Sequence, residues 1–194
     1  MGTSTTEAED EAGRRGPACA HIVLYRGDGS DRDLSLDEIA PPDDENDLLW
    51  VDIDCDAPEL VECVAEKLGI PQEALPHLTQ LGQAPLLRSY GDYLVIQAVV
   101  VDHAGELRFD GVVLTIAAGP EFVLTVHHRP IDFIPAIRKR EHGETRLGML
   151  NEASFVVSLL DWQLGSYFAV VSDFEREVER LEQEVLQNRY EQST

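Results

Sequence analysis

A long apolar repeat in the C-terminal part of the chain has the spacing of one face of an α-helix. From Leu160 onward, apolar residues recur at alternating steps of four and three. The members of the repeat are Leu160, Leu164, Tyr167, Val171, Phe174, Val178, Leu181 and Val185. This 3.5-residue period places them on one stripe of a helix that needs a packing partner. Because no glycine or proline stop follows Val185, the pattern predicts a helix that runs off the end of the chain.

The expected length of this helix exceeds the size of the domain that precedes it. A helix from near Met149 to Tyr190 would be about 60 Å long at ~1.5 Å per residue. A compact domain of this size is only roughly 40 Å across, so the helix should project as a stalk. We therefore expect a disordered tail at residues 1–18, an α/β domain at 19–148, and the start of the long stalk helix at 149–194.

The sequence pattern before the stalk predicts strands and helices in mixed order. The strands are expected at 21–25, 48–53, 93–102, 109–117 and 122–127, and the helices at 57–68, 72–80 and 130–141. Asp56 is expected to cap the first helix and Gly69 to end it. This order indicates a mixed sheet covered by helices.

The composition is strongly acidic. The 194 residues include 37 acidic and 15 basic side chains, a formal net charge of −22. Such a surface repels nucleic acid and anionic lipid and attracts cations, although acidity that serves only solubility explains the same composition. The most apolar stretches, residues 93–101 and 155–171, are too short or too interrupted by polar side chains to span a membrane. We expect a soluble chain that binds neither nucleic acid nor membrane.

The chain has three cysteines, Cys19, Cys55 and Cys63, whose pattern indicates the redox state of the cellular compartment. Their number is odd, they have no CxxC spacing, and they follow no signal-peptide pattern. This favours free thiols in a reducing cytoplasm.

Acidic residues that follow the apolar stretch 48–53 raise the possibility of phosphoryl-transfer chemistry. A phosphotransferase of the haloacid dehalogenase type would use Asp52 as nucleophile and Asp54 as acid/base. That chemistry also needs a lysine and further acids that hold Mg²⁺, yet the chain has only Lys67 and Lys139 and no acidic pair after a later parallel strand. No phosphate loop or nucleophile elbow is present either, so we expect no catalytic residues and no enzyme activity.

Two further polar sites fall in or beside predicted apolar elements. His127 and His128 are adjacent at the end of a predicted strand, where neighbouring side chains face opposite sides and cannot share one metal ion. Asp161 follows Leu160 in a very apolar helical stretch, where a buried carboxylate is costly. Asp161 therefore either reaches solvent or meets a cation or donor from a neighbouring subunit.

Seven short segments follow one another in a recognisable order along the chain, at residues 50–53, 68–71, 74–78, 83–94, 122–127, 159–168 and 181–186. Taken together, these segments resemble the N-terminal cytoplasmic domain of the CorA family of divalent-cation channels. The resemblance covers residues 20–190 and implies an α/β/α sandwich on a long stalk helix, a funnel-shaped homopentamer, and Mg²⁺ uptake gated by intracellular Mg²⁺. It also implies a place on the cytoplasmic face of the inner membrane. Related transporters carry Co²⁺, Ni²⁺ or Zn²⁺, and the ZntB zinc transporters are the close variant.

The chain departs from this family at two places. The Gly-Met-Asn signature of the pore entrance is missing, so we expect no pore in this chain. Acids that help to bind the sensing ion in the family are replaced here by Pro76 and His77, whereas the matching acid of the stalk helix is retained as Asp161. The resemblance thus makes His77 and Asp161 the candidate metal ligands. An imidazole with one carboxylate suits Zn²⁺, Co²⁺ or Ni²⁺ better than Mg²⁺, so either a softer metal is sensed or the site is lost.

The sequence as a whole favours the regulatory, metal-sensing cytoplasmic domain of a CorA-like magnesium/cobalt transporter. The expected ligand is a divalent cation, Mg²⁺ first and Co²⁺, Ni²⁺ or Zn²⁺ as alternatives, and the expected partners are copies of the same chain. A ZntB-like zinc transporter domain is one alternative. A phosphotransferase that uses Asp52 and Asp54 is the alternative from another class.

Overall fold

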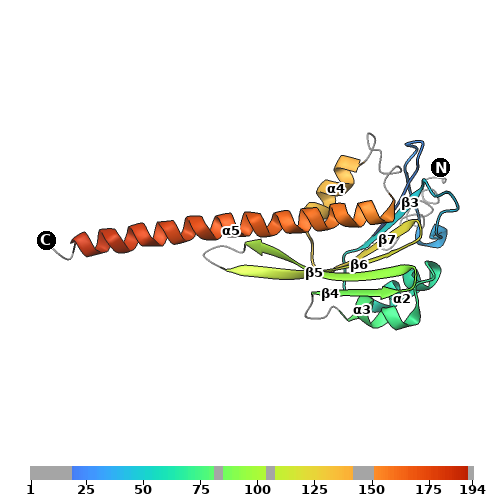
Figure 1. The fold of residues 1–194 in the computed structure, drawn as a ribbon, viewed down its shortest axis with the longest axis horizontal. Helices are drawn as coiled ribbons and strands as arrows, with labels where there is room; N and C mark the ends of the chain where they lie inside the picture. Colours follow the sequence, from blue (N-terminus) through green and yellow to red (C-terminus); the bar gives the residue numbers. More distant parts are fainter. Residues whose placement is uncertain (1–18, 81–84, 104–107, 142–150, 192–194) are drawn as a thin grey trace, which may run out of the picture.

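A mixed seven-stranded sheet forms the centre of the molecule (Figure 1). The computed structural model describes residues 19–80, 85–103, 108–141 and 151–191. The strands are β1 (Ala20–Tyr25), β2 (Arg32–Asp33), β3 (Leu48–Ile53), β4 (Leu86–Tyr90), β5 (Tyr93–His103), β6 (Phe109–Gly119) and β7 (Phe122–Val126). Their order in the sheet is β2-β1-β3-β7-β6-β5-β4, with β3 and β7 parallel and the other neighbouring pairs antiparallel.

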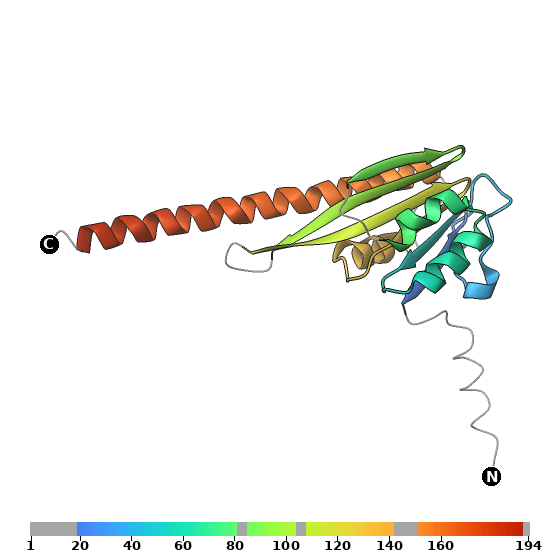
Figure 2. The ribbon, with the colours of Figure 1, turned by 90° about the horizontal axis from the view of Figure 1, so that it is seen from below.

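Helices cover both faces of this sheet. The helices are α2 (Pro58–Lys67), α3 (Leu75–Thr79), α4 (Phe133–Glu141) and α5 (Glu152–Glu191), with 3-10 turns η1 (Leu36–Glu38) and η2 (Gln72–Ala74). Figures 1 and 2 show α2 and α3 on one face and α4 with the first part of α5 on the other. All residues of β3 and β7 are buried, as expected for strands covered on both sides. The predicted α/β/α sandwich with a mixed sheet and a long C-terminal helix is confirmed.

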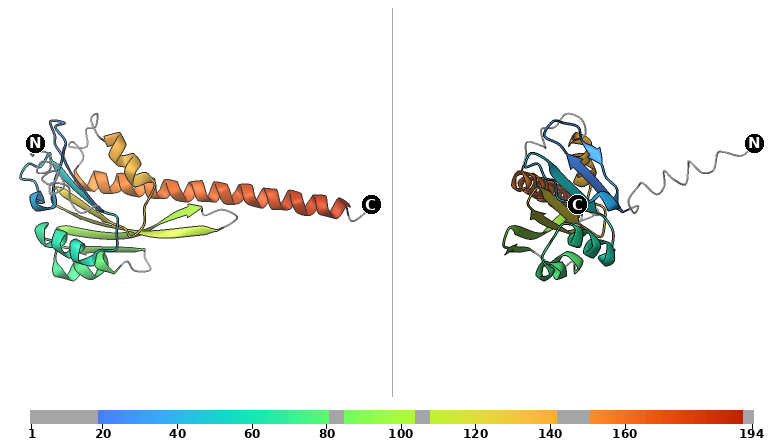
Figure 3. Two further views of the ribbon diagram at one scale, coloured as in Figure 1. Left: turned by 180° about the vertical axis from the view of Figure 1, so that it is seen from behind. Right: turned by 90° about the vertical axis from the view of Figure 1, so that its right-hand side faces the viewer.

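The long helix α5 is attached to the domain at its beginning and projects from it afterwards (Figure 3). Asn151 precedes it, and the Asn151 side chain accepts a hydrogen bond from the backbone N–H of Ser154 at 3.0 Å, as a helix cap does. Phe155 and Leu159 are buried against the sheet. Farther along, the Phe174 ring still lies 6.1 Å from that of Phe109 on β6.

The predicted apolar stripe of α5 lies open to solvent. Leu164, Val171 and Val185 are 53%, 51% and 58% exposed, and the other exposed members are Tyr167, Phe174 and Leu181. By length and apolar composition α5 could cross a membrane over Glu152–Gln187, which differs from the sequence expectation. Core helices pass the same test, and the first turns of α5 pack on the sheet. This criterion therefore does not assign α5 to a membrane.

Several local predictions need correction. Ala57, not Asp56, is the residue before α2, and no side chain caps this helix end. The helix expected from residue 130 begins at Phe133, and Ile131 in the non-helical segment before it is buried in the core. Gly69 ends α2 as predicted, with a φ of +68°. The expected tail at 1–18 and the expected domain boundary at 148–149 lie outside the described residues.

The cysteines also differ from expectation. Cys19 precedes β1 and Cys55 follows β3, and the antiparallel pairing of these strands brings the two Cα atoms to 5.7 Å. This spacing suits a disulfide, and the structure pairs them in one. Only Cys63 of the three is a free thiol, as predicted, and it is exposed.

Two glycines provide a paired test of the packing. In a Gly119→Ala variant the new Cβ would lie 2.6 Å from the Phe122 ring and 2.8 Å from the Tyr93 ring. We expect the free energy of unfolding to fall by about 1–3 kcal/mol. Gly165 in α5 has nothing within 4 Å of such a Cβ, so Gly165→Ala should raise it by about 0.5–1 kcal/mol. Urea unfolding measures the free energy of unfolding of both variants. Changes of the same sign in the two variants would contradict this packing.

Candidate functional site

Asp161 lies on the exposed side of α5, at a cavity of about 600 Å³. The cavity lies between α5, strands β5 and β6, and the segment that leads into α4. Its walls are mainly apolar and include Val112, Ile131 and Trp162. In the single chain Asp161 is therefore open both to solvent and to a neighbouring copy, so both alternatives from the sequence stay open.

Two further carboxylates line the same cavity. Asp132 comes from the segment before α4, and Asp173 comes from α5 three turns beyond Asp161. Asp173 is also paired with Arg176 on the same helix. These groups give the cavity a negative potential that attracts cations. Among the described residues, however, no group of three or more His, Cys, Asp and Glu side chains is placed to hold a metal ion.

His77 lies on the opposite side of the sheet from Asp161. It is half-buried on α3, where its carbonyl accepts a hydrogen bond from Gln97 Nε2 at 2.8 Å. Its ring is 6.4 Å from the ring of Tyr90. Because α3 and α5 cover different faces, His77 and Asp161 do not meet within one chain. An ion bound by both would have to lie between two copies.

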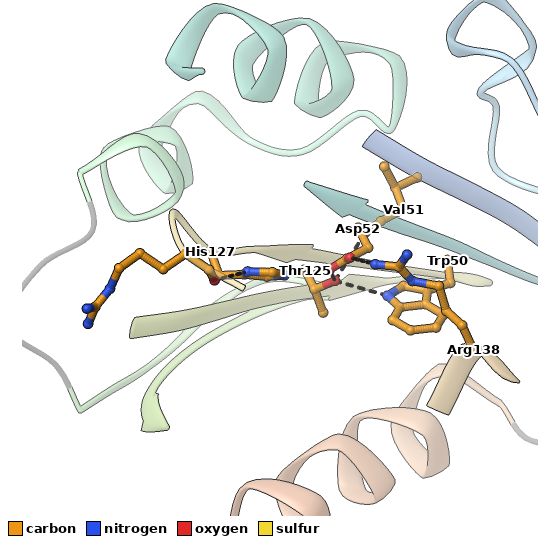
Figure 4. A network of polar contacts seen from close by, with 7 residues as sticks. Trp50, Val51, Asp52, Thr125, His127 and Arg138 are labelled. Atoms are coloured by element: carbon orange, nitrogen blue, oxygen red, sulfur yellow. Dashed lines mark hydrogen bonds and ion pairs between the residues drawn. The ribbon is translucent and has the colours of Figure 1, made fainter. Parts of the chain in front are cut away.

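A second group of side chains, here named the buried ion cluster, consists of Asp52, Thr125, His127 and Arg138 (Figure 4). Asp52 lies near the end of β3, Thr125 and His127 at the end of the parallel strand β7, and Arg138 on α4. Asp52 Oδ1 accepts hydrogen bonds from Thr125 Oγ1 at 2.5 Å and His127 Nε2 at 3.2 Å, and Asp52 Oδ2 accepts one from Arg138 Nη2. Asp52 and His127 are each 1% exposed. One carboxylate thus binds two basic groups in the core.

Neighbouring groups hold this cluster in place. Trp50 Nε1 donates to Thr125 Oγ1 at 3.0 Å, and the Trp50 ring lies 6.0 Å from the Arg138 guanidinium carbon. His127 Nδ1 is 2.7 Å from the backbone carbonyl oxygen of Arg129. The Trp50 ring in turn packs edge-on against Phe155 of α5, with centroids 5.0 Å apart. The cluster therefore connects β3, β7, α4 and, through Trp50, α5.

The environment shifts the pKa values of both titratable partners. Burial would raise the pKa of Asp52, but the hydrogen bond and charge of His127, aided by the other donors, hold it below the ordinary 3.8. Burial would lower the pKa of His127, but the hydrogen bond and charge of Asp52 raise it above the ordinary 6.5. The Arg129 carbonyl and the Asp54 charge add to this rise. Both groups are thus stabilised in their charged forms.

This geometry does not support the phosphotransferase alternative. Both oxygens of Asp52, the proposed nucleophile, accept hydrogen bonds, Oδ1 from the buried Thr125 and His127 and Oδ2 from the half-buried Arg138. Of the adjacent histidines, His127 is buried and His128 is exposed, which confirms that they face opposite sides. The buried ion cluster was not predicted from the sequence. A usable signal was a single acid inside the apolar stretch 48–53, because a buried carboxylate requires buried donors.

Residues 45–194, from just before β3 onward, match the family described as CorA-like Mg²⁺ transporter protein. The chain belongs to this family. A search of curated protein sequences found no match for this CorA-family chain.

Solved structures share the fold of this CorA-family chain. The full-length CmaX protein matches with a TM-score of 0.70 and 19% identity over 84% of this chain and 50% of that protein. The soluble domain of CorA from Methanocaldococcus jannaschii matches with a TM-score of 0.66 and 23% identity over 85% of this chain and 64% of that one. The ZntB cytoplasmic domain from Vibrio parahaemolyticus matches with a TM-score of 0.62 and 15% identity over 80% of this chain and 62% of that one. The chain thus spans between half and two thirds of these proteins, and the likeness is one of fold.

Proposed function

We propose that this chain is the cytoplasmic, cation-sensing domain of a CorA-family divalent-cation transporter and has no enzyme activity of its own. The family match over residues 45–194 carries this proposal. The fold supports it, since similar structures include the soluble domain of a CorA and the cytoplasmic domain of a ZntB. In this proposal the domain lies on the cytoplasmic face of the inner membrane, and the exposed part of α5 is the stalk.

The mechanism that we propose is electrostatic. Copies that each carry a net charge of −22 repel one another when their carboxylates approach. Divalent cations bound between copies replace that repulsion by attraction and so favour one arrangement of the stalks. Asp161 of one copy and His77 of the next are the proposed ligands, because they lie on opposite faces of the same domain. The exposed apolar stripe of α5 supports self-association, which we propose gives a homopentamer in the full-length protein.

The identity of the cation depends on His77. Carboxylate oxygens suit Mg²⁺, whereas an imidazole nitrogen favours Zn²⁺, Co²⁺ or Ni²⁺. Mg²⁺ is our first proposal because of the family, and a ZntB-like response to Zn²⁺ is the second because of His77.

Metal titration by calorimetry tests the proposed ligands. The chain should bind Mg²⁺, and Asp161→Asn should weaken the affinity about tenfold, the loss of about 1.4 kcal/mol. If a softer metal is sensed, His77→Ala should weaken Zn²⁺ binding and leave Mg²⁺ binding unchanged. Asp56→Asn is the matched control, since Asp56 is also an exposed acid but lies at the start of α2. Equal affinities in all variants would remove Asp161 and His77 from the proposal.

A further inference from the structure

The hydrogen bonds of the buried ion cluster determine the protonation state of His127. Nδ1 of His127 faces the carbonyl oxygen of Arg129 at 2.7 Å, and a carbonyl oxygen can only accept. Nε2 of His127 faces Oδ1 of Asp52 at 3.2 Å. That carboxylate also accepts hydrogen bonds from Thr125 and Arg138, which favours its ionised form. Both ring nitrogens must therefore donate, and only the imidazolium form has two N–H groups.

The cluster consequently holds two positive side chains against one negative side chain. His127 and Arg138 are the cations and Asp52 is the anion. If His127 lost its proton at Nε2, the nitrogen lone pair would face the Asp52 carboxylate. The hydrogen bond would then be replaced by repulsion between two acceptors. If His127 lost its proton at Nδ1 instead, the lone pair would face the carbonyl oxygen of Arg129. Either neutral form therefore loses one of the two contacts that hold the end of β7.

We propose that His127 is a pH-operated switch whose proton holds the segment between β7 and α4, and α4 itself, against the sheet. This segment begins at His127, and α4 carries Arg138, so both attachments share the one carboxylate of Asp52. The same segment lines the cavity with Ile131 and Asp132. Release of the His127 proton as pH rises loosens this wall of the cavity. This switch is separate from the proposed cation response and does not depend on it.

The other charged groups around His127 agree with this assignment. Asp54, just after β3, adds a negative charge that favours the imidazolium form. His21 on β1 lies opposite Asp52 in the strand register, but it is exposed. The Arg129 guanidinium donates to the Gly111 carbonyl and pairs with Asp110 on β6 at 3.6 Å. Arg129 therefore contributes its backbone carbonyl oxygen to His127, while its guanidinium is bound elsewhere.

Nitrogen-15 NMR of the whole chain tests the proton directly. At neutral pH both ring nitrogens of His127 should have shifts of the protonated form. Amide hydrogen–deuterium exchange of α4, corrected for intrinsic rates, should accelerate about tenfold as pH rises through the His127 transition. This is the effect of losing one charge-assisted hydrogen bond.

Two variants separate the switch from general destabilisation. In His127→Gln the exchange of α4 should already be fast at neutral pH and should not depend on pH. His128→Gln, a change at the exposed neighbour, should behave as the unaltered chain does. If His127→Gln does not fold, the nitrogen titration of the unaltered chain decides alone. A neutral His127 ring at neutral pH, or exchange of α4 that ignores the transition, would overturn the proposal, whatever the metal titration shows.

Discussion

Replacing Asp52 by asparagine is expected to lower the free energy of unfolding by about 3–5 kcal/mol. The asparagine has the same shape but no charge, so His127 and Arg138 would lose their shared counter-ion in the core. Breaking a buried ion pair at one partner costs more than the pair contributes, because the remaining charge stays desolvated. Urea unfolding at neutral pH measures the loss.

The matched control is Asp56→Asn, four residues farther along the chain. Asp56 is exposed, and its side chain does not cap α2, so the change should stay within about 0.5 kcal/mol. A loss for Asp52→Asn no larger than that for Asp56→Asn would contradict the buried ion cluster.

The same cluster sets the pH range of its contribution. The pKa of Asp52 is lowered in the folded state, so its contribution is present above the ordinary 3.8 and is lost as pH falls through the folded value. The pKa of His127 is raised, so its contribution is full below 6.5 and is lost as pH rises through the folded value. The stability difference between the unaltered chain and Asp52→Asn should therefore be greatest between pH 3.8 and pH 6.5, where both contributions are full.

Truncation of Phe155 to alanine is expected to cost about 3–5 kcal/mol, because it leaves a cavity beneath α5. Phe155 is 1% exposed and packs edge-on against Trp50, so it joins the first turns of α5 to β3. The loss should appear as a lower urea midpoint and as faster amide exchange in the first turns of α5.

Val157→Ala is the control for this helix. Val157 lies two residues away and is 65% exposed, so its truncation removes little buried surface. A change within about 0.5 kcal/mol is expected. Equal effects of the two substitutions would mean that α5 is not held by its Phe155 face.

Much of the fold follows from local patterns in the sequence. The apolar stretch 48–53 and the repeat from Leu160 predict β3 and α5 because their burial and periodicity are strong. The edge strands β2 and β4 were not predicted. In β4, the exposed Leu87, Arg88 and Ser89 give no alternation, and the strand is formed through its pairing with β5. Tertiary pairing thus decides where local propensity is weak.

The site was less predictable than the fold. Asp161 could be identified as an exposed acid on α5, but the cavity beside it needs β5, β6 and the segment before α4 in place. For Asp52 the sequence indicates an acid at the end of a strand, with a nucleophile as the alternative. Its partners His127 and Arg138 lie 75 and 86 positions away, and no periodic pattern connects residues at that separation. The parallel pairing of β3 and β7 brings them together.

Sedimentation velocity of the chain in Mg²⁺, against Na⁺ at matched ionic strength, tests most directly whether divalent cations bind between copies of the domain. Screening by salt is then equal in both samples, so that a difference reports bound divalent ions. We expect a larger species in Mg²⁺, or in Zn²⁺ if His77 selects the softer ion. This species should return to the smaller one with chelator and should be less abundant in Asp161→Asn. Identical sedimentation in all of these conditions would contradict the binding of divalent cations between copies.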